Sequence, residues 1–514
     1  MTDRLQQQVM DKGIKIFDGY QVIGILTNSE RTQAVGLLAL NLNALDDPDQ
    51  RYVAFNCTNI IYATGGPAGI YASSVYPTSQ TGATGIALEA GAKGRNLTES
   101  QYGIASIKFR WNLSGTYQQV LPRYISTDQD GNDEREFLWD YFEDAGKLLD
   151  AVFLKGYQWP FDPRKIENFG SSLIDFLVYN ETVIKGRRVF LDYTKNPGAK
   201  DESQELDFSL LGEEAYQYLE KSGALFGTPI ERLAHMNQPA IDLYKDNGID
   251  LTKEYLEIAV CAQHNNGGLG GNIWWESNLK HFFPIGEVNG SHGVYRPGGS
   301  ALNSGQVGGL RAAEYIAARY KQDPMGVDSF INLTVNQINE KIELGKKFMS
   351  NKEKGSNVLD IRNKIGKRMD LAGAHIRSLE GARQGAKEAK EMLLSLGEIT
   401  SISSLAELPH AYKNYDLLLT QYVYLSAIAD YIEKGGKSRG SYLIYDEKGI
   451  LPVKGLPEKF RCSLDNGQLD SFIQETTFKD GQVSFEWVKV RPIPEGEDWF
   501  ENIWNDYRKG TIFD

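Results

Sequence analysis

Residues 264–309 constrain the fold of this chain more than any other stretch, because twelve of these 46 residues are glycine. Glycine at this density indicates backbone at positive φ, or backbone pressed against something that leaves no room for a Cβ. Within the segment, the apolar run HFFPI ends at Gly286-Glu287, and Gly298-Gly299 precede a stretch with helical periodicity. An acidic residue at a strand end and a glycine turn into a helix are typical of sites that seat nucleotide-type cofactors.

A second glycine turn lies nearer the N-terminus. Three apolar-rich runs broken by turn signals predict strands over residues 14–66, and the last run, NIIYA, stops at Thr64-Gly65-Gly66. A short continuous apolar run predicts a buried parallel strand. A helix is expected to follow, with Thr81-Gly82 at its start. Taken alone, this strand–turn–helix is as often purely structural as cofactor-binding, since short glycine motifs are weak signals.

Length and composition exclude several classes of protein. A chain of 514 residues predicts two to four domains. The net charge of −13 disfavours a nucleic-acid groove, and no apolar run is long enough to span a membrane, so a cytoplasmic protein is expected. Cys57, Cys261 and Cys462 are widely spaced, which supports neither a metal or iron–sulfur site nor a disulfide framework.

The rest of the chain divides by composition. Residues 1–13 predict a helix that ends at Gly13. Residues 98–258 begin with strands and a hairpin at DQDGND and continue through polar helices that end at LTKEYLEIAVCAQH. Residues 324–440 are rich in Lys and Glu with helical periodicity, which predicts a helical bundle. Residues 441–514 return to strand-like alternation and end in an aromatic-rich tail.

The glycine motifs form an ordered set: Ala63 to Gly66, Thr81 to Gly85, His264 with Gly267-Gly268, Gly286-Glu287, His292-Gly293, Arg296, residues 298–302 (GGSAL), and Ser438-Arg439-Gly440. In this order and spacing they resemble the succinate dehydrogenase/fumarate reductase flavoprotein family, which includes aspartate oxidase. The resemblance implies an α/β (α+β overall) architecture. A partial Rossmann-like FAD-binding domain (1–97 and 259–323) would carry an inserted capping domain (98–258), a helical domain (324–440) and a β-rich extension (441–514).

The resemblance also implies roles for single residues. Glu287 would accept hydrogen bonds from the ribose of FAD, and the turn Thr64, Gly65, Gly66 with Thr81 and Gly82 would let the backbone approach the cofactor. Gly299, Ser300, Ala301 and Leu302 would begin a helix facing the flavin ring. Arg296 would anchor a substrate carboxylate, and His264 would hold the other end of the substrate. The alternative for His264 is a purely structural histidine, and the alternative for Arg296 is a surface salt bridge.

Two departures argue against succinate or fumarate as the substrate. Gln101 to Ser106 stand where the family carries a Phe-His-Pro-Thr tract, and Gly170 to Leu173 stand where it carries the proton-delivering arginine. Possible substitutes in the capping region are Arg110, Arg123, Arg135, Arg164, Tyr102 and Tyr117. Aromatic enrichment in this region predicts a larger or more apolar carboxylate substrate.

A third departure concerns the cofactor itself. No G-x-G-x-x-G turn precedes Ala63, so the segment that holds the FAD pyrophosphate is expected from a longer protein or from another chain. Without it, the sheet would have an unpaired edge and exposed apolar surface, and FAD would bind weakly or not at all. The leading hypothesis is a flavin-dependent oxidoreductase that receives electrons from a separate donor protein. The alternatives are a non-catalytic binding subunit or an NAD-dependent dehydrogenase.

Overall fold

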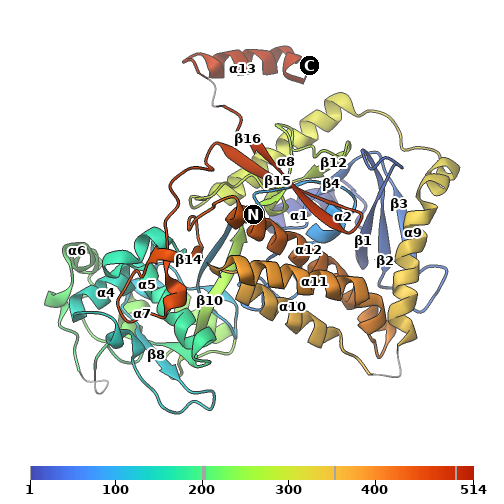
Figure 1. The fold of residues 1–514 in the computed structure, drawn as a ribbon. Helices are drawn as coiled ribbons and strands as arrows, with labels where there is room; N and C mark the ends of the chain where they lie inside the picture. The colour runs from blue at the N-terminus through green and yellow to red at the C-terminus, as the bar shows by residue number, and fades with distance from the viewer. Residues whose placement is uncertain (1, 200–203, 352–354, 493–494, 514) are drawn as a thin grey trace.

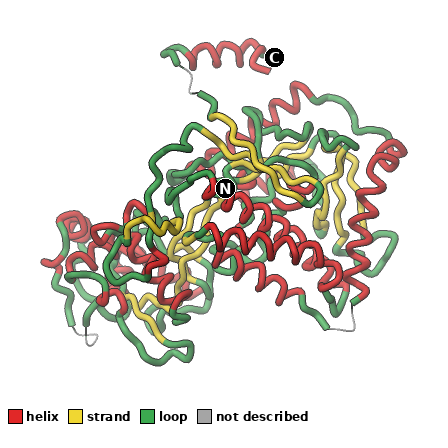
Figure 2. The backbone as a smooth tube through the Cα atoms, in the orientation of Figure 1, coloured by secondary structure: helices red, strands yellow, loops and turns green. Residues whose placement is uncertain are grey.

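The structure is a computed structural model that describes residues 2–199, 204–351, 355–492 and 495–513 (Figure 1). Helices and strands are mixed along the chain, which confirms the α/β class expected from the sequence (Figure 2). The capping region, which holds α4 to α7 and β8, forms one lobe, and helices α10 to α12 lie between this lobe and the sheet β1–β3 (Figure 1). Helix α13 lies at the edge of the molecule, where its Tyr507 hydroxyl donates to Glu314 at 2.9 Å.

The N-terminal part contains the predicted helix and strands. Their bounds are α1 (Thr2–Asp11), β1 (Tyr20–Thr27), β2 (Ala34–Asn41), β3 (Tyr52–Asn56) and β4 (Ile60–Tyr62). The first three strands form an antiparallel sheet in chain order. Strand β4 pairs in parallel with β12 (Phe282–Pro284), with Ile60 opposite Phe282. The strands that lead into the two glycine turns are therefore parallel neighbours.

One expectation about β4 needs correction. The apolar run predicted a buried strand, but Ile61 is 48% exposed, whereas Ile60 and Tyr62 are buried. Within the described residues, β4 and β12 form a sheet of only two strands, and Ile61 lies on its more exposed face. This agrees with the predicted open apolar surface next to the cofactor motifs.

The capping region is built on a five-stranded sheet with the order β7-β6-β10-β9-β8. Its strands are β6 (Ser100–Ser106), β7 (Trp111–Asn112), β8 (Arg123–Thr127), β9 (Arg188–Asp192) and β10 (Leu256–Asn265), and its helices are α3 (Thr116–Gln119), α4 (Ala145–Leu154), α5 (Ser172–Tyr179), α6 (Glu213–Lys221) and α7 (Pro229–Asp246). Two predictions were wrong here. Helix α4 was not expected, and Leu256–Asn265 is a strand because it pairs on both sides, with β6 and β9.

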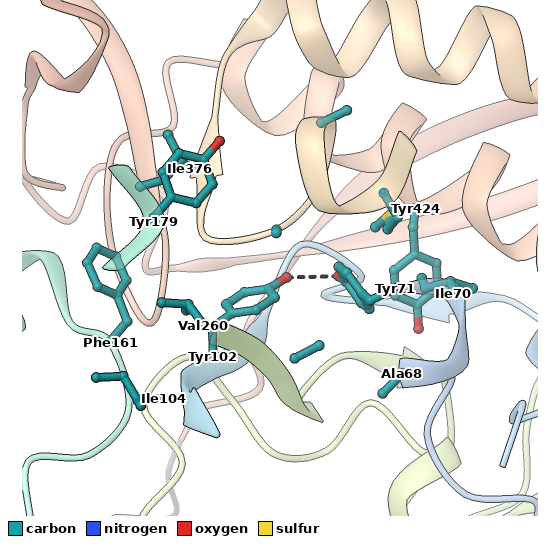
Figure 3. Close-up of a cluster of buried hydrophobic side chains, with 14 of the residues drawn as sticks. Ala68, Ile70, Tyr71, Tyr102, Ile104, Phe161, Tyr179, Val260, Ile376 and Tyr424 are labelled. Carbon is teal, nitrogen blue, oxygen red and sulfur yellow. Dashed lines mark hydrogen bonds between the residues drawn. The ribbon is translucent and has the colours of Figure 1, made fainter. Parts of the chain in front are cut away.

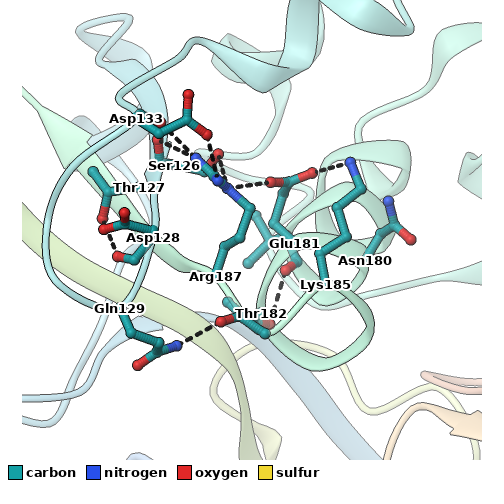
Figure 4. Close-up of polar contacts among 12 residues, drawn as sticks. Ser126, Thr127, Asp128, Gln129, Asp133, Asn180, Glu181, Thr182, Lys185 and Arg187 are labelled. Atoms are coloured by element: carbon teal, nitrogen blue, oxygen red, sulfur yellow. Dashed lines mark hydrogen bonds and ion pairs between the residues drawn. The ribbon is translucent and has the colours of Figure 1, made fainter.

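A polar cluster fastens the end of α5 to the turn after β8 (Figure 4). The chain continues from α5 into a π-helical turn, Asn180–Ile184, in which Glu181 is fully buried. The Glu181 carboxylate lies 2.5 Å from Lys185 Nζ and 3.3 Å from Arg187 Nε, and Arg187 also pairs with Asp133 at 2.8 Å. The buried carboxylate is thus paired, which offsets the cost of removing its charge from water.

The helices predicted over residues 324–440 are present, and they pack against the glycine motifs. They are α9 (Val327–Ser350), α10 (Val358–Ala372), α11 (Leu379–Ile399) and α12 (Leu408–Glu433). Helix α12 is buried along most of its length and contacts α2 (Thr84–Glu89). Between α10 and α11, β13 (Ile376–Arg377) pairs in parallel with β14 (Leu443–Ile450). None of the helices in the described part of the chain is long and apolar enough to cross a membrane.

The C-terminal extension shares a sheet with strands from earlier in the chain. Strands β15 (Phe472–Lys479) and β16 (Gln482–Lys489) lie in the part of the chain where strand-like alternation was predicted, and they form an antiparallel pair. Strand β15 joins β5 (Gly94–Arg95) and β11 (Gly268–Leu269) in one sheet. Helix α8 (Ser300–Arg319) begins where a helix facing the flavin ring was expected, and only its Gly308 and Ala312 are buried. Its Leu302 and Leu310 are 64% and 62% exposed. The terminal helix α13 (Trp499–Lys509) has no buried residue.

Candidate functional site

Glu287 lies at the centre of a polar cluster at the ends of β10 and β12. The Tyr76 hydroxyl donates to Glu287 Oε2 at 2.8 Å, and His264 Nε2 lies 3.3 Å from Oε1. Burial alone would raise the pKa of Glu287, but the contacts with His264 and Tyr76 outweigh it and hold the pKa below its usual value. Glu287 is therefore an ionised acceptor, and its side chain is still 34% exposed. A carboxylate in this state can accept further hydrogen bonds from a ligand.

His292 packs edge-on against His264, with the ring centroids 4.7 Å apart. Burial, and next the neighbouring His264, lower the pKa of His292 to about 4, so the ring is neutral at pH 7. Among the described residues, neither ring nitrogen makes a hydrogen bond of good geometry, and the same is true of the buried Thr64 Oγ1 and Asn265 Oδ1. Buried polar atoms normally have hydrogen-bond partners. Four such atoms without partners near the Thr64–Gly66 turn therefore mark a place where a polar ligand fits.

Arg296 is held by a residue of the capping sheet. Its Nε donates to Gln101 Oε1 at 2.9 Å, and the Gln101 amide donates to the Arg296 carbonyl at 3.2 Å. Both residues line a cavity of about 360 Å³ between the glycine loop and the capping region. The other residues that line it are Tyr157, Gln158, Pro160, Phe161, Asp162, Lys165, Tyr295, Pro297, Gly440 and Ser441. Arg296 and Lys165 thus line the cavity with one carboxylate, Asp162, which is already paired with Arg164 at 2.7 Å. The two remaining cations suit an anionic ligand.

The glycine loops leave open space beside this cluster. Gly286 and Gly299 have φ of +69° and +78°, and no atom lies within 4 Å of the position a Cβ would take. Gly299 is the N-cap of α8, a helix of 20 residues. The Ser300 amide donates to the Pro297 carbonyl at 3.3 Å, and the amides of Ala301 and Leu302 follow in the first turn. Such a helix end, in front of an open glycine face, favours the approach of a negatively charged or electron-rich group.

The first glycine turn lies against the same cluster. A Cβ on Gly66 would lie 3.4 Å from Asn265 Oδ1 and 3.6 Å from the Glu287 carbonyl oxygen. Thr64, Gly65 and Gly66 are therefore neighbours of Glu287, as the sequence suggested. At Gly65, however, the Gln80 side chain covers the turn and donates to the Thr64 carbonyl at 2.8 Å. A cofactor at this turn would have to displace Gln80.

Thr81 and Gly82 lie behind the turn rather than in front of it. A Cβ on Gly82 would meet Pro67 Cα at 2.7 Å. The N-terminus of α2 faces Asp416 of α12, whose Oδ1 accepts from the Ile86 amide at 2.9 Å. Asp416 already occupies this helix end, so Thr81 and Gly82 support the shape of the turn, and their contact with a cofactor stays a prediction.

His264 and Arg296 do not face the same space. His264 is buried, and its Nδ1 lies 2.9 Å from Asn266 Oδ1. It does not line the cavity at Arg296. The two residues are linked through β6, because His264 lies opposite Gln101 in the register of β10 and β6. The sequence analysis did not predict Tyr76 or Gln101 as site residues. No local sequence motif marks a tyrosine or a glutamine that contacts a residue far away in the chain.

The proposed substitutes for the missing arginine are mostly engaged elsewhere. Arg123 pairs with buried Asp192 at 2.7 Å, and the Tyr117 hydroxyl donates to the Ala240 carbonyl inside the capping region. Arg110 donates to the Tyr76 carbonyl at 2.9 Å. Arg164 pairs with Asp162 at 2.7 Å and stacks on Tyr295 of the cavity wall. No group of His, Cys, Asp and Glu among the described residues could hold a metal ion.

Three comparisons bear on this geometry. A fumarate reductase (CoM/CoB) subunit of Methanothermobacter marburgensis is 26% identical over 315 residues, which cover 61% of this chain and 47% of that protein. L-aspartate oxidase of Acinetobacter baylyi is 33% identical over 78 residues, covering 15% of this chain and 14% of that protein. Quinol fumarate reductase of E. coli superposes with a TM-score of 0.64 and 18% identity, over 96% of this chain and 75% of that one. No protein-family model matches the chain.

The fold is thus that of the flavoprotein subunits of fumarate reductases, with an open glycine face beside a cavity lined by two cations. The resemblance seen in the sequence is confirmed: the relatives that match stretches of the chain are a fumarate reductase subunit and an L-aspartate oxidase, and the fold is shared with quinol fumarate reductase. The chain spans about half the length of the fumarate reductase subunit that it matches.

Proposed function

We propose that this chain forms part of an FAD-dependent oxidoreductase that acts on a carboxylate-bearing, unsaturated substrate other than fumarate. The observation that carries the proposal is the position of Arg296. Its guanidinium lines a cavity together with Lys165, and it lies in the chain between Gly293 and Gly299, both of which have open space where a Cβ would be. A guanidinium next to such an open face is suited to hold a carboxylate where a bound cofactor can reach the adjacent carbon.

The residues around the open glycine face fit FAD. Ionised Glu287 would accept from ribose hydroxyls, and the orphaned Thr64 Oγ1, Asn265 Oδ1 and His292 ring offer further polar contacts. The N-terminus of α8 would face the pyrimidine edge of the flavin. When bound, FAD would supply the hydride chemistry.

The chain's own residues bind and orient the substrate. Arg296 would hold one carboxylate, and Gln101 fixes the direction of its guanidinium by the reciprocal hydrogen bonds described above. Lys165 faces the same cavity and would neutralise further negative charge on the substrate. Phe161, Tyr157 and Tyr295 also line the cavity, which favours a body more apolar than that of fumarate.

The proposal includes partners. An additional dinucleotide-binding unit, from the longer protein or from another chain, would cover Ile61 of β4 and the exposed face of α8. Electrons would come from a separate donor protein, because the three cysteines of the chain are unpaired and far apart in sequence. The acidic net charge agrees with the cytoplasm as the proposed location.

A turnover screen tests the substrate proposal. The complete FAD-loaded protein, reduced by a chemical donor, is offered fumarate and larger unsaturated carboxylates with aromatic or branched bodies. The proposal expects a larger carboxylate to be the best acceptor and Arg296→Gln to abolish its turnover. Fumarate as the best acceptor would contradict it.

The alternative is a non-catalytic subunit, which is favoured by one observation. Ser171 and Ser172 stand where the family carries its proton donor; both are buried, with Ser171 Oγ bonded to Gln158 and Ser172 Oγ to the Asp162 amide. If the protein binds FAD but reduces no acceptor in the screen, this alternative holds.

A further inference from the structure

A large groove lies between the capping region and the helical domain, apart from the cavity at Arg296. Its volume is about 1160 Å³, which is ample for a metabolite-sized ligand, and no residue lines both spaces. The lining residues are Tyr179, Val183, Ile184, Leu371, Ile376, Arg377, Ser378, Leu379, Glu380, Arg383, Gln384, Lys387, Tyr445 and Lys459. They come from α5 and its π-helical turn, from α10, β13 and α11, and from the C-terminal extension.

The groove is positively charged in a protein whose net charge is −13. Its ionisable side chains are four cations (Arg377, Arg383, Lys387 and Lys459) and one carboxylate, Glu380. Arg383 is paired with Glu433 at 2.8 Å. Lys387 and Lys459 make no ion pair with any residue in the described ranges. A local concentration of unpaired cations on an acidic protein attracts anions.

The floor of the groove contains a buried cation without a counter-ion. Arg377 is 2% exposed and donates to the carbonyls of Ala374 and Thr98 and to the Tyr102 hydroxyl, at 2.7, 2.8 and 3.1 Å. All three acceptors are neutral, and no described carboxylate lies within ion-pair distance of Arg377. The guanidinium also stacks on the Tyr442 ring, 4.0 Å from its centroid. No carboxylate neutralises the buried charge, so an anion in the groove would stabilise this arrangement further.

The walls of the groove also expose apolar surface. Val183, Leu371 and Tyr445 are 40%, 62% and 40% exposed, although all three lie inside the groove. Apolar side chains beside ammonium and guanidinium groups match a ligand with an apolar body and an anionic head.

From the groove, the buried Arg377 and the exposed apolar walls, we infer that this protein carries a second ligand site. It takes an organic anion with an apolar body, such as an aromatic or aliphatic carboxylate. The head group lies among Arg377, Lys387 and Lys459, and the body lies against Leu371 and Val183.

Aromatic side chains lie between this site and the cavity at Arg296, and two of them, Phe161 and Tyr179, are labelled in Figure 3. Tyr179 lines the groove, Phe161 lines the cavity, and His375 lies between them, with ring centroids 4.9 Å from Tyr179 and 5.4 Å from Phe161. Binding in the groove can therefore be measured separately from binding at Arg296.

The test is isothermal titration of the protein with 2-naphthoate and with the uncharged 2-naphthylmethanol. The groove variants are Lys387→Glu/Lys459→Glu and, independently, Leu371→Asp. Matched controls are Lys364→Glu, which changes an exposed lysine of α10 outside the groove, and Arg296→Gln, which removes the cation of the other cavity. Circular dichroism checks that each variant is folded.

We expect saturable binding of 2-naphthoate, with the alcohol and both groove variants weaker by at least about tenfold and both controls within about twofold of wild type. The inference is overturned if 2-naphthoate does not bind, if the alcohol binds equally well, if folded groove variants keep full affinity, or if Arg296→Gln removes the binding. None of these results depends on FAD or on turnover. The cavity at Arg296 is also proposed to take aromatic carboxylates, so binding that persists in Arg296→Gln and is lost in the groove variants is the result that assigns the groove.

Discussion

Arg296 and Gln101 hold each other by two hydrogen bonds, one from the guanidinium Nε to the Gln101 side chain and one from the Gln101 amide to the Arg296 backbone carbonyl, at 2.9 and 3.2 Å. The two residues are 195 positions apart, in the glycine loop and in strand β6. The pair thus fastens the loop that carries Arg296 to the capping region. Gln101 is a positioning residue in this account, because it acts through Arg296.

Gln101→Leu is expected to raise the KM for the preferred carboxylate acceptor by about tenfold, with a smaller effect on kcat. The substitution keeps the size of the side chain but removes both hydrogen bonds, so the guanidinium loses its fixed direction. Steady-state kinetics of the FAD-loaded protein measure the effect. Gln217→Leu, on the exposed face of α6, is the control. An unchanged KM would show that Gln101 does not position Arg296.

Asp416→Asn is expected to flatten the dependence of stability on pH. Burial raises the pKa of Asp416 to about 7 from 3.8, so the folded protein keeps this proton while the unfolded chain has lost it. Wild-type stability should therefore fall as pH rises from about 4 to about 7, by up to a few kcal/mol for this group. Denaturant unfolding at several pH values measures the slope. Equal slopes in wild type and Asp416→Asn would contradict the assignment.

His375 is expected to make stability depend on pH in the opposite direction, and His375→Phe should remove this dependence. Burial, with Arg377 nearby, lowers the pKa of His375 to about 3, so the folded state resists protonation that the unfolded chain accepts below about pH 6.5. This group therefore costs stability as pH falls from 6.5 toward 3. The phenylalanine ring fits among Tyr102, Phe161 and Tyr179, and the variant should be more resistant to acid than wild type. Thermal melts at pH 7 and pH 4.5 make the comparison; an equal loss of Tm in both proteins would refute the prediction.

Lys155→Met is expected to destabilise the capping region by about 3–5 kcal/mol. Lys155 Nζ pairs with Asp175 at 2.7 Å, and both side chains are fully buried, so the substitution leaves a carboxylate without its cation. The double variant Lys155→Met/Asp175→Leu should recover much of the loss, because no charge then remains buried. Urea unfolding of the two variants tests this, and a double variant as unstable as Lys155→Met would contradict the charge-pair explanation.

The sequence predicted those site residues whose role depends on their immediate neighbours in the chain. Glu287 was singled out because it ends an apolar run and begins a glycine turn, and the structure places it just after β12, which pairs in parallel with β4. The ordered spacing of the glycine motifs likewise identified the family. The helices of residues 324–440 and the strand character of the C-terminal extension followed from periodicity alone.

Contacts between distant segments were not predictable. Tyr76 and Glu287 are 211 positions apart, and Asp416 and Ile86 are 330 apart, so no window of sequence joins them. The strand Leu256–Asn265 was missed because its long apolar run lacks alternation; tertiary pairing with β6 and β9 decides its conformation. The apolar run itself predicted a buried β4. Exposed apolar surface was expected only because the segment that holds the FAD pyrophosphate is absent from the sheet.

The central claim is that the glycine-rich segment forms one wall of an FAD site. Equilibrium FAD titration, followed by flavin fluorescence, tests it most directly on the complete protein that contains this chain and on residues 1–514 alone. The account predicts about one FAD per complete protein, at least tenfold weaker binding for Glu287→Leu and Gly299→Val, and little or no binding to residues 1–514 alone. Full-affinity FAD binding by both variants, or a yellow chain of residues 1–514 with one FAD bound, would contradict the account.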